Sequence, residues 1–590
     1  MKYDFTSLFD RQGWDAIAVE GLGLQPGFTP DAPRNDFDII PLWIADQNFA
    51  TVPTITEALQ KRSAHPAFGY YNTREEYYQA IINWQKVRNG VTDLKKEHIG
   101  YENGVLGGVI TALNVLCSRG DKVLIHSPTY IGFTMVLENN GYQMVHSPFV
   151  LDEAGVWRMD YKDMEEKIVR EHIHACVFCS PHNPCGRVWE KEELLQMCEL
   201  FEKYDVKVVC DEIWSDLLLN GAKHTPLQSV NAWARENVIA LYAPSKTYNL
   251  SGLIGSYHII YNKTLRERVD KEGSLSGYNN QNVLSMHALI GAYTPEGMEW
   301  TDQLKEVLST NINLACDYIR EHFPGVKAVK PQGTYMLYVD CTEWCEKNGK
   351  SIQDVEKACW RVGCAVQDGT MFGGKCHFRM NLALPTERVQ EALRRMDEYV
   401  FNGTVPLHRL QVGQPFPDLP CTFHTGESGT VHSLLKGKTV FWVLRYIGCT
   451  VCRYDVHLLK ERYEEFRKLG AEVCVILQSD PQHVQKELQE SGESLPFPIL
   501  CDPEQTFYKA LDIQPAGNMA ELVGDLPALK EKGAKAAACG FRHGDYEGNE
   551  RQLPALFITD EEGKAAYCCY GESITGLPSI DRVLEILKEL

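Results

Sequence analysis

The sequence predicts an α/β chain in which a large, mostly parallel sheet domain with a small α/β part precedes a second, shorter α/β unit. Between residues 100 and 290, short apolar runs rich in β-branched residues alternate with helical patterns. Such alternation is typical of a mostly parallel sheet covered by helices on both faces. A Gly- and Pro-rich stretch at residues 399–421 separates this region from a second alternation of the same kind.

Five short apolar runs predict strands of the large sheet. A helical pattern, "EKEELLQMCELFEKYD", lies between the second and the third run. Parallel sheets of this kind bind ligands at the carboxyl ends of their strands, so polar residues that follow the runs are candidate site residues. The runs are residues 121–128, 174–181, 206–213, 237–244 and 256–262.

The composition near residue 400 sets the expected domain boundary at about residue 405. Residues 1–400 are expected to form the first domain and residues 413–590 the second, with a linker at 401–412. Within the first domain we expect a large part at about 50–290 and a small part made of residues 1–49 and 291–400.

Composition excludes several classes of function. The 590 residues carry a formal net charge of -20, which argues against nucleic acid or an anionic membrane as a partner. The first residues lack the apolar core of a signal peptide, and no apolar run is long enough to span a bilayer. A cytoplasmic protein is therefore expected, with most of its 20 cysteines reduced and buried and no zinc-binding cysteine pattern.

The stretch "YAPSKTYNLSG" (242–252) places Lys246 in a short polar turn between two strand-like runs. Most lysines are exposed, and a surface position is the simplest explanation for one lysine taken alone. A lysine that is buried at such a corner loses charge and becomes a nucleophilic amine, as Schiff-base chemistry requires.

Four further signals follow strands or open helices. Asp211 in "CDEIWSD" ends a strand, and Asn183 in "SPHNPCGRVW" stands in a Pro- and Gly-bounded turn. Residues 101–116, "YENGVLGGVITALNVL", form a Gly-rich turn that opens a helix, whose amides suit a phosphate. Tyr130 in "SPTYIGF" follows another strand and can stack on a flat ligand. Each signal alone also fits a structural role.

The order of these signals resembles that of fold-type I pyridoxal phosphate (PLP) enzymes. Over roughly residues 30–400 the chain resembles the aminotransferase class I/II family through "PHNPCGRVW", "CDEIWSD" and "PSKTYNLSGL". "PLWIADQNF", "FGYYN", "YENGVLGG" and "FRMNLALP" resemble the cystathionine β-lyase / cysteine-S-conjugate β-lyase branch of that family. The resemblance implies a fold-type I PLP-dependent transferase fold and PLP as the cofactor.

The resemblance also implies a role for each matching residue around the cofactor ring. Lys246 would hold PLP covalently and act as the general base. Asp211 would keep the pyridine nitrogen protonated, so that the ring accepts electrons. Asn183 would donate to the ring hydroxyl oxygen, and Tyr130 would stack on the ring.

The same resemblance implies which residues bind the phosphate and which bind the substrate. The backbone of Val105 and Leu106, with Ser245, would hold the phosphate. Tyr70 would reach the phosphate from a neighbouring subunit, which implies a homodimer. Arg379 would bind the substrate carboxylate as a planar fork.

Several positions depart from the pattern of the family. Ile254 replaces the arginine that aminotransferases carry eight residues after the lysine, and the β-lyase branch also lacks that arginine. Ala243 replaces a frequent serine, and Trp214 replaces a Tyr or His near the ring oxygen. Gln47 and Asn48 replace a Met-Asp pair near the substrate entrance.

The resemblance implies β-elimination on cystathionine or another S-substituted cysteine, with release of thiol, pyruvate and ammonia. Two alternatives stay open. One is an aminotransferase, against which Ile254 argues. The other is a non-catalytic regulator that keeps the fold, which the full set Lys246, Asp211, Asn183 and Arg379 disfavours.

The second unit contains a CxxC pair at the start of a helix. In "RYIGCTVCRYDVHLL" (445–459), Cys449 stands near a helix N-terminus, where the helix dipole stabilises a thiolate. A second pair with the same spacing, Cys176 and Cys179, lies within a strand run and is expected to be inert packing.

From about residue 408 the chain resembles the thioredoxin-like superfamily. "VGQPFPDLPC" is similar to peroxiredoxins of the AhpC/TSA group, and "LPALFITDEEGK" to the thioredoxin segment with a cis proline, here Pro554. A thiol-disulfide reductase, with Cys449 as attacker and Cys452 as resolver, is preferred. In the alternative, a peroxidase, Cys452 is the peroxidatic cysteine, but Cys449 replaces the expected threonine and Pro554 replaces the expected arginine, although Arg551 is close.

The presence of both units in one chain suggests a joint activity. A β-lyase that acts on cystine or on a mixed disulfide releases a persulfide, which a dithiol reduces. The expected partners are therefore a sulfur amino acid as substrate, a second copy of the chain, and a thiol reductant for the CxxC pair.

Overall fold

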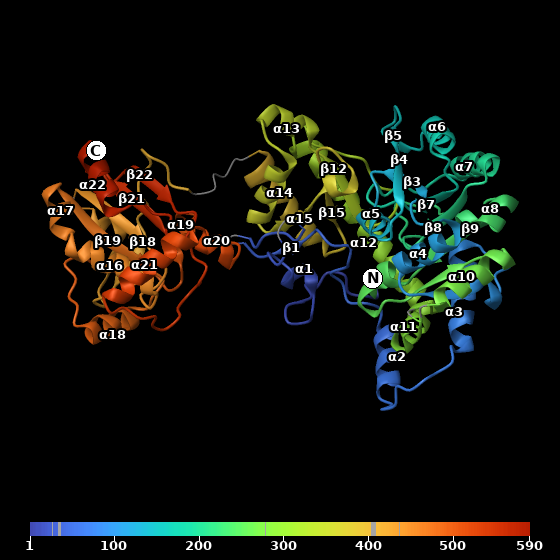
Figure 1. The fold of residues 1–590 in the computed structure, drawn as a ribbon, viewed down its shortest axis with the longest axis horizontal. Helices are drawn as coiled ribbons and strands as arrows, with labels where there is room; N and C mark the ends of the chain where they lie inside the picture. The colour runs from blue at the N-terminus through green and yellow to red at the C-terminus, as the bar shows by residue number, and fades with distance from the viewer. Residues whose placement is uncertain (26–27, 34–36, 276, 278, 403–408, 436) are drawn as a thin grey trace. The chain divides into compact units, whose positions relative to one another are not determined.

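The structure, a computed structural model, describes the chain as two compact units (Figure 1). The first unit comprises residues 1–30 and 39–403, and the second comprises residues 31–38 and 404–590. The expected boundary near residue 405, with residues 403–408 of the expected linker, lies outside the described residues. The structure describes all of residues 1–590 except 26–27, 34–36, 276, 278, 403–408 and 436.

A seven-stranded mixed sheet forms the centre of the first unit, as the alternating apolar runs predict. Its last five strands run parallel to one another, whereas β10 runs antiparallel to both of its neighbours because the chain turns back at the edge where β9 ends. In spatial order the strands are β2 (Ile99–Glu102), β10 (Ser256–Ile259), β9 (Val238–Tyr242), β8 (Lys207–Asp211), β7 (Ala175–Cys179), β3 (Lys122–Ser127) and β4 (Gln143–Pro148).

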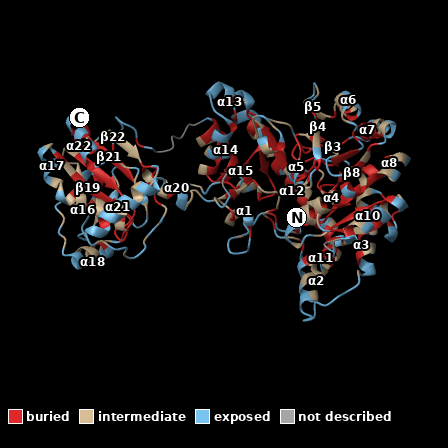
Figure 2. Cartoon of the chain, viewed as in Figure 1, coloured by how far each residue is buried: buried red, intermediate tan, exposed pale blue. Residues whose placement is uncertain are grey.

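The central strands β7 and β9 are buried along their whole length, and β8 is buried except at Lys207 (Figure 2). Strands with helices on both faces read as continuous apolar runs, which explains sequences such as "VIALY" in β9. Helix α4 (Val105–Leu116) packs against β8, β9 and β10. Across the part of the chain that the structure describes, no helix is both long and apolar enough to cross a membrane.

A smaller antiparallel sheet belongs to the same unit and carries Arg379. Helices α12 (Pro295–His322) and α15 (Thr386–Met396) pack together beside it. The strands, in spatial order, are β11 (Lys327–Ala328), β12 (Met336–Asp340), β15 (His377–Asn381) and β14 (Gln367–Asp368).

The second unit is a thioredoxin-like α/β fold around another seven-stranded sheet. Alternate residues of β18 enter two separate apolar clusters, Val440 and Trp442 on one face and Phe441 and Val443 on the other. Helix α16 (Thr450–Glu461) follows β18 directly. The strands, in spatial order, are β17 (Ser428–Thr430), β16 (Pro420–Phe423), β20 (Ile499–Cys501), β19 (Ala471–Leu477), β18 (Lys438–Val443), β21 (Ala555–Thr559) and β22 (Ala565–Tyr570).

The turn after β7, which carries Asn183, closes through Gly186. Gly186 has a φ of +64°, and a Cβ at that position would lie 2.2 Å from Cβ of Pro331. Its amide donates to the His182 carbonyl at 2.7 Å, and its carbonyl accepts from the amides of Gln332 and Gly333. This turn therefore depends on glycine both for its backbone conformation and for space.

We expect Gly186→Ala to destabilise the first unit more than Gly155→Ala does. Gly155 has a similar φ of +74° but no atom within 4 Å of its added Cβ. The left-handed backbone costs about 1–2 kcal/mol in both variants, and the clash adds about 1–3 kcal/mol in the Gly186 variant. Urea unfolding of the first unit measures the difference, and equal midpoints for the two variants would contradict this account.

Candidate active sites

A cavity of about 210 Å³ lies at the carboxyl ends of β7, β8 and β9. Parallel strands end at one edge of a sheet, so residues that are far apart in the sequence meet there. Two predicted residues do not line this cavity. Arg379 lies behind it and donates a hydrogen bond to Asn183, which does line it. Tyr70 is fully exposed on the single chain. The predicted residues that line it are Val105, Leu106, Tyr130, Asn183, Asp211, Ser245 and Lys246.

Lys246 lies on the short helix α9 (Ser245–Tyr248) rather than in the simple turn that the sequence predicts. Its Nζ donates a hydrogen bond to the Ala45 carbonyl at 2.9 Å and lies 6.0 Å from the centre of the Trp214 ring. Burial lowers the pKa of Lys246 to about 8, the charge of Asp46 opposes this shift, and the charge of Arg379 adds to it. A substantial fraction of this amine is therefore neutral near pH 8.

Asp211 ends β8 and faces the same cavity. Its Oδ1 accepts from the backbone amide of Ile213 at 3.0 Å. Burial raises the pKa of Asp211 to about 7, while that amide and the Lys246 ammonium lower it. A buried carboxylate of this kind gains stability from a cationic hydrogen-bond donor placed against it.

The N-terminus of α4 forms another wall of the cavity. Gly104 stands immediately before the helix with a φ of +77°, which a side chain would strain. Residues Val105 to Gly107 line the cavity, and the amides of this first helical turn have no carbonyl four residues earlier within the helix. Together with the dipole of this 12-residue helix they make a site for an anion.

Tyr130 covers part of the cavity and is fixed by a close backbone approach. A Cβ on Gly132 would lie 2.3 Å from the Tyr130 ring, so only glycine leaves room for that ring position. The Phe133 ring packs edge-on against Tyr130 with centroids 5.4 Å apart. The ring is thereby held in place as a flat apolar surface.

Arg379, on β15, is buried without a carboxylate partner among the described residues. Its guanidinium donates to the Trp43 carbonyl at 2.9 Å, to Gln367 at 2.7 Å and to Asn183 Oδ1 at 3.2 Å, and its Nε has no partner there. Burial lowers the pKa of Arg379 to about 10. An unpaired buried guanidinium favours an anionic ligand such as a carboxylate.

Gln47 has a role that the sequence did not predict. Its side-chain amide donates to the carbonyls of Lys246 at 2.7 Å and of Thr247 at 2.9 Å. Its backbone forms a reciprocal pair with the Asn249 side chain. Gln47 therefore holds the helix that carries Lys246, although the two residues are 199 positions apart and no local motif links them.

Three other departures from the expected pattern lie at the cavity. Trp214, Ala243 and Ile254 all line it. Ile254 has a φ of +43°, an unusual backbone for a β-branched residue, and its side chain is about half exposed. Cys179, expected to be inert packing, is buried and lines the cavity as well, with its thiol donating to the Pro181 carbonyl at 3.2 Å.

This set of donors and acceptors fits PLP. The Lys246 amine can bind the aldehyde of PLP, and the buried Asp211 carboxylate can pair with the protonated ring nitrogen. The N-terminus of α4 can bind the phosphate, and Tyr130 can stack on the face of the ring. The buried Arg379 adds a cation for the carboxylate of an amino acid.

The second candidate site is the cysteine pair at the start of α16. Cys449 is the N-cap of the helix, and its Sγ accepts from the Cys452 amide at 3.4 Å and from the Arg445 guanidinium at 2.8 Å. The hydrogen bond from the Cys452 thiol, followed by the charge and hydrogen bond of Arg445, lowers the pKa of Cys449 to about 6, against the effect of burial. Burial raises the pKa of Cys452.

The helix N-cap position of Cys449 and the Arg445 guanidinium at its Sγ favour Cys449, not Cys452, as the attacking thiolate. The peroxidase alternative requires the low pKa at Cys452, its peroxidatic cysteine. The arginine beside the pair is Arg445, whereas Arg551 donates to the Gly517 carbonyl. The expectation that Pro554 follows a cis peptide bond is wrong: in the described residues such bonds precede Pro128, Pro181 and Pro184.

Residues 543–550, called here the covering segment, lie against the loop that carries Cys449. The Gly544 amide donates to the Gly448 carbonyl at 2.8 Å, and a Cβ on Gly448 would lie 2.1 Å from the Asp545 carbonyl oxygen. His543 Nε2 lies 3.3 Å from the Tyr446 hydroxyl. Only 2% of Cys449 is exposed, so disulfide exchange requires a local movement that uncovers the thiol.

Comparison with known proteins relates each unit to a family. Residues 38–396 match the family described as Aminotransferase class I and II, and residues 412–568 match the AhpC/TSA family. The cystathionine beta-lyase PatB of Bacillus subtilis strain 168 is 32% identical over 396 residues, which cover 67% of this chain and 98% of that protein.

Two solved structures with PLP resemble the first unit. Cystalysin from Treponema denticola, which contains a pyridoxal 5'-phosphate cofactor, superposes with a TM-score of 0.63 at 29% identity and covers 68% of this chain and 100% of that one. The PLP-bound C-S lyase from Staphylococcus hominis has a TM-score of 0.60 at 29% identity and covers 67% of this chain and 98% of that one.

Replacement of Arg445 by glutamine is expected to slow alkylation of Cys449 at pH 6. The guanidinium stabilises the thiolate, so its loss raises the apparent pKa of the cysteine pair. Loss of a hydrogen bond to a charged group costs about 1.5 kcal/mol or more, and one pKa unit corresponds to about 1.4 kcal/mol. The thiolate fraction at pH 6 then falls about fivefold.

Iodoacetamide labelling across pH, read at the Cys449 peptide by mass spectrometry, measures this shift. Arg453→Gln is the matched control, because Arg453 lies on α16, the helix that Cys449 caps, and pairs with Glu487 instead. An unchanged pH profile in Arg445→Gln would show that the guanidinium does not stabilise the thiolate.

Proposed function

Because this chain belongs to the aminotransferase class I and II family, we propose that it is a PLP-dependent carbon-sulfur β-lyase whose AhpC/TSA unit is a thiol-disulfide reductase. The first unit belongs to the C-S lyase branch of the family and takes PLP as its cofactor. The observation that carries the proposal is the buried Lys246 amine, with its lowered pKa, beside Asp211 in one cavity. Ile254, in place of an arginine, favours elimination over transamination.

Each residue has a defined task in this proposal. PLP, when bound, supplies an electron sink for the carbanion that forms at Cα of an amino acid. Lys246 Nζ would hold the cofactor covalently and would take the Cα proton of the substrate. Asp211 holds a proton on the ring nitrogen through its carboxylate, and the α4 N-terminus binds the phosphate.

Arg379 orients the substrate. Its buried fork binds the carboxylate and so fixes the position of Cα relative to Lys246 Nζ. Asn183 accepts from Arg379 and would donate to the ring oxygen of PLP, so one side chain would join the cofactor site to the substrate site. Removal of the proton by Lys246 lets thiolate leave from Cβ, and water then releases pyruvate and ammonia.

L-Cystathionine is the first substrate to test. The full chain loaded with PLP is expected to form pyruvate and free thiol in a one-to-one ratio. Lys246→Ala is expected to lose this turnover and the visible absorbance of covalently held PLP, because the anchor and the base are the same amine. Lys191→Ala, an exposed lysine on α7 (Lys191–Tyr204), is the control and is expected to behave as the parent chain.

Two results would contradict the lyase assignment. Turnover and covalent PLP in Lys246→Ala would exclude Lys246 from both roles. A keto acid that retains the whole substrate side chain, without free thiol, would show transamination instead of elimination.

We propose further that the two units act on one sulfur atom in succession. β-Elimination from cystine breaks the Cβ–S bond and releases cysteine persulfide, pyruvate and ammonia. The Cys449–Cys452 dithiol then attacks the persulfide: its two thiols lose two electrons and form a disulfide, while the persulfide becomes cysteine and hydrogen sulfide. A thiol reductant returns the disulfide to the dithiol.

In a single turnover of the reduced chain on cystine, without added thiol, Cys449→Ser is expected to release less sulfide. Pyruvate is expected to stay unchanged, because that variant leaves the PLP unit intact. Cys474→Ser, in a buried thiol of the same unit, is the control. Equal sulfide from Cys449→Ser and from the parent chain would exclude the joint reaction while leaving the lyase assignment untouched.

A further inference from the structure

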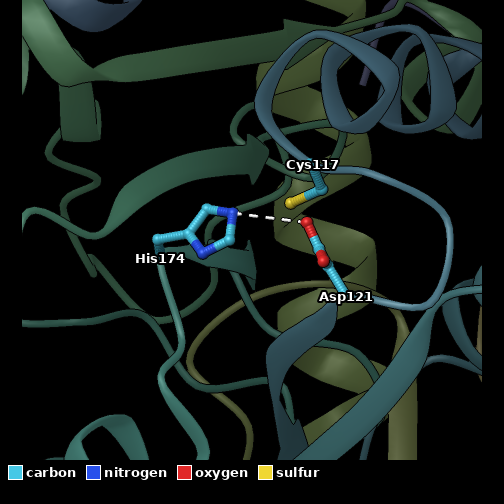
Figure 3. Close-up of side chains that lie close together, drawn as sticks. All are labelled: Cys117, Asp121 and His174. Carbon is cyan, nitrogen blue, oxygen red and sulfur yellow. Dashed lines mark ion pairs between the residues drawn. The ribbon is translucent and has the colours of Figure 1, made fainter.

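Three side chains that the PLP site does not use converge at the opposite edge of the large sheet. Cys117 ends α4, Asp121 directly precedes β3, and His174 directly precedes β7 (Figure 3). These are the amino ends of the strands, whereas the PLP cavity lies at the carboxyl ends. Helix α4 spans about 18 Å at 1.5 Å per residue, so it separates the cluster from the anion site at its N-terminus.

The geometry of the cluster suits a tetrahedral metal ion. The Cys117 thiol, a carboxylate oxygen of Asp121 and a ring nitrogen of His174 all lie within 4.8 Å of one another. His174 Nε2 and Asp121 Oδ2 are 3.6 Å apart. Two ligands of one tetrahedral zinc ion lie about 3.3–3.8 Å apart at ordinary bond lengths, so small side-chain adjustments bring all three atoms to a common ion.

The surroundings hold these groups in place and leave them reachable. The Ser118 amide donates to Asp121 Oδ2 at 2.7 Å, and the Asp121 amide donates to the Ser118 carbonyl. These bonds fix the carboxylate, as hydrogen bonds around metal sites commonly do. Cys117 is half-buried, while the His174 side chain is about half exposed, so an ion can enter from solvent.

The thiolate form of a cysteine beside a carboxylate is unfavourable unless a cation binds both groups. Burial and the charge of Asp121 together raise the pKa of Cys117 to about 12. A divalent cation inverts this effect, because it binds the thiolate and releases the proton. The thiolate and imidazole select a borderline-soft ion such as Zn²⁺ over Mg²⁺ or Ca²⁺, which prefer oxygen ligands.

We propose that Cys117, Asp121 and His174 bind one Zn²⁺-like divalent ion, with a fourth position open to water. The ion links the end of α4 to the starts of β3 and β7. Because it binds only the folded arrangement, it stabilises the first unit against unfolding in proportion to its free concentration.

Equilibrium dialysis of the PLP-loaded full chain against Zn²⁺ tests the proposal. All variants are made in a background chain that also carries Cys449→Ser and Cys452→Ser, because the dithiol would otherwise compete for zinc. One Zn²⁺ per chain is expected. Cys117→Ser and His174→Ala are each expected to weaken Zn²⁺ binding at least about tenfold. Loss of a residue that only supports a metal ligand already costs about tenfold, and loss of a ligand itself costs at least as much. Cys376→Ser, in another half-buried cysteine, is the matched control and is expected to retain the ion.

A second readout separates ligand loss from misfolding. Zn²⁺ is expected to raise the unfolding temperature of the first unit in the background chain and in Cys376→Ser, but not in Cys117→Ser. The visible absorbance of bound PLP reports whether each variant is folded. No stoichiometric binding in the background chain, or equal binding in folded Cys117→Ser, would overturn the proposal, and Mg²⁺ bound equally well would overturn the assigned metal class.

Discussion

The burial of the Lys246 amine is the constraint on which the first unit depends. A lysine ammonium loses much of its hydration in such a place, and the chain compensates with the Ala45 carbonyl and with charges held nearby. That carbonyl lies in the segment next to Gln47, which in turn holds the helix of Lys246. The segment before α2 (Pro53–Ser63) and the end of β9 therefore meet at the same amine, which contacts the first through the Ala45 carbonyl and follows the second in the chain.

The two units make nucleophiles by opposite physical means. In the first unit, removal of water destabilises the charged form of Lys246, so the neutral amine becomes accessible near neutral pH. In the second unit, hydrogen bonds and the Arg445 charge stabilise the charged form of Cys449 in spite of burial. The amine needs to be neutral to attack and the thiol needs to be an anion, so each environment favours the reactive state.

Motifs that are continuous in the sequence predicted most of the fold and of the PLP site. Asp211, Asn183 and Lys246 each follow a strand, and strand order alone brings them to one edge. The Gln47 contact was not predictable, because it joins distant segments through backbone carbonyls that any residue provides. The covering segment was missed for a similar reason, since its contacts with the Cys449 loop are made largely by backbone atoms. The cis bond expected at Pro554 came from family resemblance and not from a local physical requirement.

The covering segment has a consequence for the kinetics of the cysteine pair. It packs against the loop of Cys449, whose thiol is almost fully buried, so a disulfide or persulfide reaches the sulfur only after a local opening. At low oxidant concentration, the rate of exchange is the product of the open fraction and the intrinsic bimolecular rate. At high concentration, the rate reaches a plateau equal to the rate of this local opening, and further oxidant has no effect. The fold thus sets an upper limit on how fast the pair is oxidised from solution, whatever its reduction potential.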